Sequence, residues 1–319
     1  MNQRKSYTAR VNAVLDHIDT HLAEPLDLQV LASIAHFSPW HFHRMFQALI
    51  GETLADRVRR RRLEVAATRL LASPPATALG IALDVGFTSA EVFSRAFKAH
   101  FGVTPTAWRQ GAYRDWAARH RIELSKIHQA QRKPHQVIEA AFRDDGHTWP
   151  SGHALTPKGS EMNVELKTLP ETRVAYMRHL GPYGDPGIGR LWQRFDAWCR
   201  QRGLVDQRHA FYGISRDSPD ITAPDKCRYD ACIEVDAAFV PEGDVGMQVM
   251  PGGLYACTPF SGTPDHIHAA WVRLCAEWLP GSDYQADDRP AVEAYGAEPK
   301  VDKNTGAFSC LLCLPVRAQ

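Results

Sequence analysis

The spacing of apolar residues predicts a helix over 38–50 that is buried on one side only. At 100° per residue its large apolar side chains fall on one stripe, which suits the core of a small helical domain. The stripe consists of Phe42, Met45, Phe46 and Leu49. The opposite face carries an aromatic ring, an imidazole, a guanidinium and an amide, from Trp40, His43, Arg44 and Gln47. Because these side-chain types reach base edges in a major groove, the exposed face is a candidate DNA-reading surface.

The pattern occurs a second time, at an offset of 51 residues. Each copy has a short helical pattern, a tight turn and a second helix that begins at a Ser or Thr cap. This order is typical of helix-turn-helix units. In the second copy the predicted buried stripe is Val92, Phe93, Ala96 and Phe97. The face left outward consists of Glu91, Ser94, Arg95 and Lys98.

Between the copies, "LADRVRRRRLEVAATRLLAS" predicts a helix of roughly 17 residues, about 25 Å long at 1.5 Å per residue. Such a rigid spacer would let two reading helices enter successive major grooves, about 34 Å apart, from a single chain. The run "RVRRRR" at 57–62 has two interpretations, a solvated charged face or a set of phosphate contacts. The sequence leaves both open.

Beyond residue 162 the periods change. Alternating strands, an amphipathic helix and two further strands are followed by the same order again, which predicts two similar α+β halves packed into one domain. Within the last of these strands, Cys310 and Cys313 form a CxxC, but residues three apart on a strand point to opposite faces, so we expect buried thiols rather than metal ligands. No metal site and no cofactor are expected anywhere in the chain.

Charge and cysteine content separate the two halves. Residues 1–133 hold 19 Lys and Arg against 11 Asp and Glu, and the remainder holds 18 against 25, although the whole chain is only +1. A basic first half favours phosphate contacts, and an acidic second half favours cations. The seven cysteines all lie in the second half without a disulfide spacing, which suits a reducing cytoplasm. With no signal peptide and no run of eighteen apolar residues, we expect a cytoplasmic protein without a membrane partner.

Glu293 is the main candidate for small-molecule chemistry. It lies in "PAVEAYG", a predicted strand that also places Tyr295 on the same face. From the residues alone, Glu293 is either on the solvent face of the sheet or a buried acid in an aromatic pocket that binds a cation. The second half supplies aromatic side chains for such a pocket: Tyr183, Trp192, Phe195, Tyr212, Tyr255, Phe260, Trp278 and Tyr295.

Residues 20–110 resemble the DNA-binding domain of the AraC/XylS family of regulators. The resemblance covers "LASIAHFSPWHFHRMFQALIGETL" with the spacer that follows it and "ALDVGFTSAEVFSRAFKAHFGVTPTAWR". It implies that Trp40, His43 and Arg44 read bases in one groove and that Glu91 and Arg95 read the next. The family often has a neutral group where Glu91 stands, and an acid there would accept a hydrogen bond from cytosine N4.

Residues 163–316 resemble the GyrI-like effector domain. The resemblance lies in "HLGPYG", "GISRDSPDITAPDKCRYDACIEV", "GGLYACTPFSGTPDHIHAAW", "EWLP" and "AVEAY". It implies two strand-helix-strand-strand modules around a pocket for small, often cationic or lipophilic compounds, with Glu293 as the anionic centre. The candidate ligand residues are therefore Glu293, Tyr183, Tyr255 and Tyr295.

These observations predict a multidomain chain in which an all-α tandem helix-turn-helix domain precedes an α+β domain. The expected boundaries are 1–114 for the DNA-binding domain, 115–161 for a linker that includes a helix, and 162–319 for the effector domain. We expect a non-enzymatic transcription regulator that binds two adjacent major grooves of duplex DNA, senses a small molecule and contacts RNA polymerase, without catalytic residues. The alternatives are a hydrolase of strained electrophiles, with Glu293 as general base, and a protein-interaction module.

Overall fold

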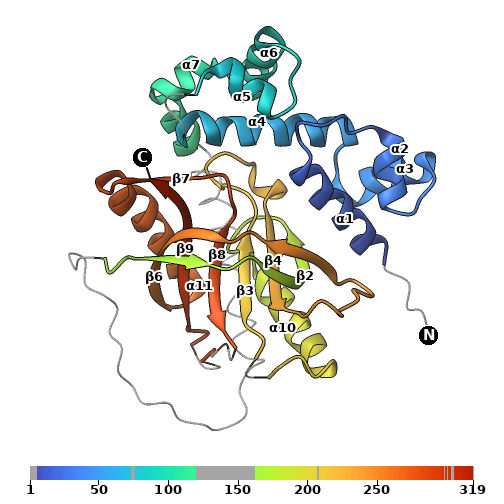
Figure 1. The fold of residues 1–319 in the computed structure, drawn as a ribbon, viewed down its shortest axis with the longest axis vertical. Helices are drawn as coiled ribbons and strands as arrows, with labels where there is room; N and C mark the ends of the chain where they lie inside the picture. Colours follow the sequence, from blue (N-terminus) through green and yellow to red (C-terminus); the bar gives the residue numbers. More distant parts are fainter. Residues whose placement is uncertain are drawn as a thin grey trace.

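The computed structural model of the protein describes residues 6–72, 76–119, 162–206, 208–297, 299, 301–302 and 305–318. Within these ranges a helical first half precedes a second half built on one large sheet (Figure 1). The prediction of an all-α domain followed by an α+β domain is confirmed. A helix over 113–119 includes the first residues of the predicted linker, 115–119, and the remainder from residue 120 to 161 lies outside the described residues.

The helices of the first half are α1 Tyr7–Thr20, α2 Leu28–Ile34, α3 Pro39–Ile50, α4 Leu54–Ala72, α5 Ala78–Asp84, α6 Ala90–Phe101 and α7 Pro105–Ala107, followed by the π-helical turn η1 Trp108–Ala112. The second helix of each predicted unit, α3 or α6, begins at a serine cap as predicted. The side chains of Ser38 and Ser89 accept a backbone N–H at the start of α3 and α6. Gly51 and Gly102 end these helices with φ of 72° and 77°, a left-handed conformation that favours glycine.

The buried stripes of the two reading helices differ in part from the predicted ones. The buried residues are Phe42, Phe46 and Ile50 in α3 and Phe93, Phe97 and Phe101 in α6. Leu49 is 38% exposed and Val92 is 39% exposed, so their assignment to the core was wrong. Both buried rows follow i, i+4, i+8 spacing, and each misplaced residue lies one position, about 100° of rotation, away from its row.

Helix α4 is the spacer that the sequence predicts. It has 19 residues, about 28 Å at 1.5 Å per residue, and it joins a core under α1–α3 to a separate core under α5–α7 (Figure 1). The sheet of the second half lies along the opposite side of α4 from α5 and α6 (Figure 1). The second half therefore packs against the spacer and leaves α6 outward.

The second half folds as one sheet with helices on one face. Its elements are β1 Glu165–Leu169, β2 Thr172–Leu180, α10 Pro186–Gln201, β3 Phe211–Ser215, η2 Pro224–Lys226, β4 Arg228–Glu234, β5 Gly246–Met250, β6 Gly253–Gly262, α11 Pro264–Arg273, η3 Leu274–Trp278, η4 Leu279–Gly281, β7 Tyr284–Ala286, β8 Ala291–Gly296 and β9 Phe308–Ala318. The strand order is β1-β6-β9-β8-β3-β4-β2-β5, with β7 paired to β9, and all neighbours are antiparallel. β1 joins the second module and β5 joins the first, so the two predicted modules exchange their opening strands.

The two faces of the sheet have different neighbours. On one face, Met177, Tyr229 and Phe211 pack under α10, while Phe260 and Leu312 pack under α11. On the other face, α1 of the first half packs near β2, where Asp16 binds side chains of that strand. A single layer of strands therefore separates the helix-covered face from the first half.

Candidate functional site

The predicted reading face of α3 is exposed. Trp40 is 70% exposed, and the guanidinium carbon of Arg44 lies 4.8 Å from the centre of its ring. His43 and Gln47 are exposed beside them. The Trp40 ring thus holds the Arg44 guanidinium by a cation–π contact on the surface that would face a groove.

The predicted reading face of α6 is also exposed, at Glu91, Arg95 and Lys98. A hydrogen bond from the Ser89 side chain, with the helix N-terminus and Arg95 nearby, lowers the pKa of the Glu91 carboxyl. Glu91 is therefore ionised near neutral pH. An ionised acid repels phosphate and accepts a hydrogen bond from a base amine, as the sequence predicts for this position.

The run "RVRRRR" is mostly buried by other parts of the protein, which neither sequence interpretation foresaw. Arg57, Arg60 and Arg61 are buried, at 0%, 9% and 7% exposure. Arg62 donates to the backbone oxygens of Leu22 and Glu24, and Arg59 is the exposed arginine of the run. Arg60 pairs with Glu52 and Glu64 of the first half, whereas Arg61 reaches Asp217 of the second half.

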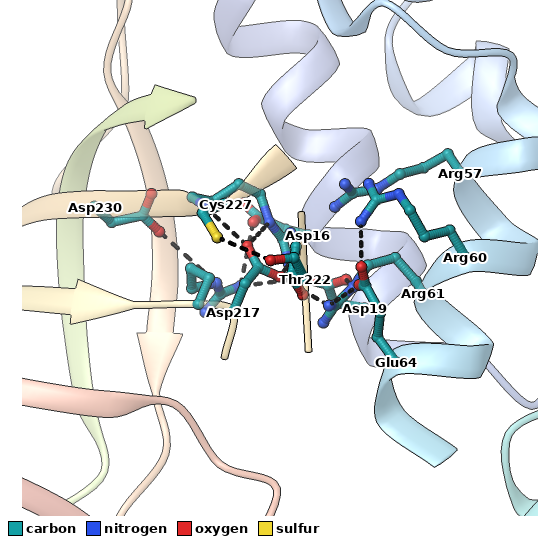
Figure 2. A network of polar contacts seen from close by, with 12 residues as sticks. Asp16, Asp19, Arg57, Arg60, Arg61, Glu64, Asp217, Thr222, Cys227 and Asp230 are labelled. Carbon is teal, nitrogen blue, oxygen red and sulfur yellow. Dashed lines mark hydrogen bonds and ion pairs between the residues drawn. The ribbon is translucent and has the colours of Figure 1, made fainter. Parts of the chain in front are cut away.

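Eight charged side chains form an ionic seam between the two halves, shown in part in Figure 2. The ionic seam consists of Asp16, Asp19, Arg61, Arg178, Arg216, Asp217, Arg228 and Asp230. The Arg228 guanidinium donates to both oxygens of Asp217 at 2.8 and 2.7 Å and to Asp19 Oδ2 at 2.6 Å. Arg61 reaches the same two carboxylates, with Nη1 2.7 Å from Asp217 Oδ1. The ionic seam therefore ties α1 and α4 directly to the sheet.

Two carboxylates of the ionic seam, Asp19 and Asp217, have lowered pKa values. Burial alone would raise the pKa of the Asp19 carboxyl, but Arg228 and Arg61 hold that pKa well below its ordinary value. The same two arginines lower the pKa of Asp217 against the effect of its burial. Because both the arginine and the aspartate of each pair are largely buried, water and salt only weakly screen their attraction.

Arg57 is the exception in this region. It is fully buried, its guanidinium makes no hydrogen bond to the described residues, and its nearest acid is Glu52 at 3.6 Å. Burial and the neighbouring Arg228 and Arg60 lower the pKa of Arg57 to about 9. A cation held this way costs stability, because it has lost its water without gaining a close partner.

We therefore expect Arg57→Met to raise the free energy of unfolding by about 1 to 3 kcal/mol, because methionine fills similar volume without a buried charge. Urea denaturation of the full chain at pH 7 measures the change. Arg60→Met is the matched control: Arg60 donates to Glu52 and Glu64 at 2.7 Å, so its loss should destabilise. A loss of stability in both variants would contradict the prediction.

Glu293 lies buried on the helix-covered face of the sheet, at 6% exposure. Its Oε2 accepts hydrogen bonds from the hydroxyls of Tyr229 at 2.6 Å and Tyr295 at 2.7 Å. Trp192 on α10 donates its Nε1 to the Tyr229 oxygen at 3.2 Å. Burial raises the pKa of Glu293, while hydrogen bonds from Tyr229, Tyr295 and Trp271 oppose that rise. We call Glu293, Tyr229, Tyr295, Trp192 and Trp271 the Glu293 cluster.

Gly213 makes room for this cluster. It is paired with Glu293 across β3 and β8, and a Cβ at this position would lie 2.0 Å from the Tyr229 hydroxyl and 2.6 Å from Glu293 Oε2. Any side chain here would push the hydroxyl and the carboxylate apart. The alternative of a solvent-facing Glu293 is therefore wrong, and the buried acid among aromatic rings is what the fold contains.

Tyr295 is the predicted ligand residue that bonds Glu293 directly. Tyr183 packs against the same core as Tyr229 and Tyr295, and its hydroxyl lies 2.9 Å from the backbone oxygens of both Asp217 and Arg228, beside the ionic seam. Tyr255 donates to the backbone oxygen of Pro251 and packs with residues on the opposite face of the sheet from Glu293. The inclusion of Tyr255 was wrong, because the sequence could not assign the faces of separate strands.

Sequence reasoning missed Tyr229 and Trp271. Tyr229 lies in "CRYDACIEV", where it alternates with Arg228 and Asp230 and was not singled out. The signal that could have found it is this alternation, since an aromatic residue between two charged ones on a strand faces away from both. Trp271 lies in the predicted helix of the second module, and no spacing linked it to Glu293.

The cysteines give no metal site among the described residues. All seven are free thiols. Cys310 and Cys313 pack in cores on opposite faces of the sheet, as their spacing predicts. In the described part of the chain, no helix combines the length and apolar character needed to cross a membrane.

Two family models match the chain. A helix-turn-helix domain model matches residues 31–111, and a model of the GyrI-like small molecule binding domain matches residues 162–317. The matched ranges contain α3 with α6 and the Glu293 cluster, respectively.

Individual proteins are similar to about a third of this chain. The regulatory protein SoxS of Escherichia coli K12 is 35% identical over 104 residues, which is 33% of this chain and 96% of SoxS. The right origin-binding protein of Escherichia coli K12 is 37% identical over 110 residues, 34% of this chain and 36% of that protein. The crystal structure of a transcriptional regulator with an AraC-type DNA-binding domain, from Chromobacterium violaceum, covers 32% of this chain and 89% of its own, with 24% identity and a TM-score of 0.31.

Proposed function

The chain belongs to the AraC/XylS family of DNA-binding transcription regulators and includes a GyrI-like small-molecule-binding domain, and from this premise we propose how its two halves act. α3 and α6 read bases in two adjacent major grooves of one duplex. The Glu293 cluster binds a small cationic or lipophilic molecule. Binding shifts an existing equilibrium between arrangements of the two domains, and through it the contact with DNA or RNA polymerase.

Base reading is assigned to Trp40, His43, Arg44 and Gln47 on α3 and to Glu91, Arg95 and Lys98 on α6. The observation that supports this assignment is their common exposure on helices at the two ends of α4. We assign Arg44 to a guanine, because a guanidinium presents paired donors that match the two acceptors on the guanine edge.

Arg44→Ala is expected to weaken specific DNA binding by about 1 to 3 kcal/mol and to relax the preference at one base pair. The measurement is anisotropy titration against a duplex selected from random sequence with this protein and against its single-base variants. Arg190→Ala, an exposed arginine on α10, is the control and should bind like wild type. An equal loss on every duplex would make Arg44 a phosphate contact.

The Glu293 cluster supports cation binding more directly than any other described group. It places one carboxylate among aromatic rings in a domain half that carries excess acid, and both features favour cations. Calorimetric titration of the full chain with benzyltrimethylammonium, a small aromatic cation, tests the site.

We propose that this domain binds its ligand without converting it. A general base takes a proton from water, whereas the hydroxyls of two tyrosines already donate to Glu293 Oε2 and occupy that oxygen. The hydrolase alternative predicts turnover of an epoxide by the wild-type chain that Glu293→Gln abolishes.

The domain boundaries stay as proposed, at 1–114, 115–161 and 162–319. The family-model ranges fall inside the first and the last of them. We also propose the cytoplasm as the site of action, because a transcription regulator has to reach the chromosome.

A further inference from the structure

We propose that strand β4 connects the Glu293 cluster to the DNA-binding half, with Arg228 and Asp230 as its positioning residues. This inference rests on the proposed function, since it assigns the regulation of the same ligand site. It names one strand that transmits the effect of ligand binding, whereas the proposed function names only a change in the arrangement of the domains.

The route follows from the alternation of side chains along β4. Arg228, Tyr229 and Asp230 are consecutive, so the middle residue points to one face of the sheet and its two neighbours to the other. Tyr229 donates to Glu293 on the helix-covered face. Arg228 and Asp230 belong to the ionic seam on the face toward the DNA-binding half (Figure 2). One short peptide segment therefore contacts both sites.

At the Glu293 cluster, the Tyr229 hydroxyl is confined by its neighbours. It accepts from Trp192, donates to Glu293, and lies directly over the backbone at Gly213. A cation that pairs with Glu293 competes with Tyr229 for the negative charge, and in this proposal it weakens or displaces the bond from the hydroxyl. Because the interior is close-packed, a displaced ring moves the strand that bears it.

On the DNA side, β4 holds both helices that support the first reading unit. Arg228 binds Asp19 of α1, and it shares Asp217 with Arg61 of α4. Asp230 accepts from Nε and Nη2 of Arg178 at 2.6 and 2.7 Å, and Nη2 also donates to Asp16 of α1 at 2.8 Å. These contacts are short and buried, so a shift of β4 either moves α1 and α4 with it or breaks the contacts.

Tyr183 strengthens the connection. Tyr183 lies in the segment that leads into α10, and α10 carries Trp192. The Tyr183 hydroxyl lies 2.9 Å from the backbone oxygen of Arg228. A change at the Glu293 cluster therefore reaches Arg228 both along β4 and through the start of α10.

The test compares the DNA affinity of the full chain with and without saturating benzyltrimethylammonium, on the selected duplex. For wild type we expect a change of about 5- to 150-fold. In Asp230→Asn and in Arg228→Lys the change should shrink below about 2-fold, while benzyltrimethylammonium itself binds as tightly as to wild type. Asp230→Asn keeps the shape of the side chain, and thermal unfolding checks that each variant is folded. Tyr212→Phe, on the adjacent β3, is the control and should keep the full effect.

An undiminished ligand effect in folded Asp230→Asn would overturn the inference while leaving cation sensing intact. If benzyltrimethylammonium does not bind wild type, the proposed cation sensing fails, and a ligand-free cycle decides the inference. That cycle measures DNA affinity for wild type, Tyr229→Phe, Asp230→Asn and the double variant. Effects that deviate from additivity by about 3-fold or more would support the route through β4, and additive effects would overturn it.

Discussion

Arg228→Met is expected to lower the free energy of unfolding by about 3 to 5 kcal/mol, the range for breaking a buried ion pair. Arg228 is 0% exposed and holds Asp217 and Asp19 with three hydrogen bonds from its side chain. Without it, both carboxylates stay buried, and Arg61 is the remaining arginine that hydrogen-bonds both among the described residues. Urea denaturation of the full chain, followed by tryptophan fluorescence, measures the loss.

The matched control is Arg59→Met on α4. Arg59 pairs with Asp56 in the open, with side chains 61% and 48% exposed, so its loss should change stability by no more than about 0.5 kcal/mol. Similar losses of stability in Arg228→Met and Arg59→Met would contradict the prediction that a buried ion pair contributes more than an exposed one.

The bonds between Arg228 and Asp217 also make the stability difference between wild type and Arg228→Met depend on pH. The pKa of Asp217 is lower in the folded chain than its ordinary value of 3.8, so its contribution is complete above pH 3.8 and is lost as the pH falls below that value. The gap in stability between wild type and Arg228→Met should therefore narrow in acid and stay constant between pH 5 and 7.

The helical half could be predicted from sequence because its signals are local. Ser38, Ser89, Gly51 and Gly102 fix the ends of the reading helices through hydrogen bonds and backbone conformations within a few residues. A stripe of apolar residues then defines which face is buried. The errors at Leu49 and Val92 come from the edge of that stripe, where a rotation of one residue decides burial.

The ionic seam could not be predicted, because its partners are far apart in the chain. Arg61 and Asp217 are separated by 156 positions, and no periodicity links them. A run such as "RVRRRR" has the same composition whether it meets phosphate, water or carboxylates. What would have distinguished these is the side of α4 on which the sheet packs, a tertiary property.

The ligand site could be predicted from the sequence only in part. Glu293 and Tyr295 share a face because they are two apart on one strand, which is a local rule. Tyr229 joins them only through the order of strands β8, β3 and β4, and Tyr255 fails to join them because β6 presents it to the other face. A list of aromatic residues could therefore supply the candidates without saying which of them meet.

Glu293→Gln is expected to weaken binding of benzyltrimethylammonium by about 2 to 5 kcal/mol, the cost of removing one partner of a buried charge contact. Glutamine keeps the size of the side chain and an oxygen that accepts from Tyr229 and Tyr295, so only the charge is lost. Neopentylbenzene has the same shape as the cation without its charge and should lose little affinity. Calorimetric titration of the full chain with this pair measures both effects.

Two controls separate the buried charge from the general acidity of the domain. Glu277→Gln removes the same charge from a side chain that is 64% exposed, and it should leave cation affinity nearly unchanged because water and salt screen it. The pH dependence is the second control. Because burial raises the pKa of Glu293 above its ordinary 4.5, a cation has to displace a proton at low pH, so wild-type affinity should rise with pH from 4.5 upward and then level off. Glu293→Gln should bind with the same weak affinity throughout, and a rise that persists in this variant would assign the cation to another acid.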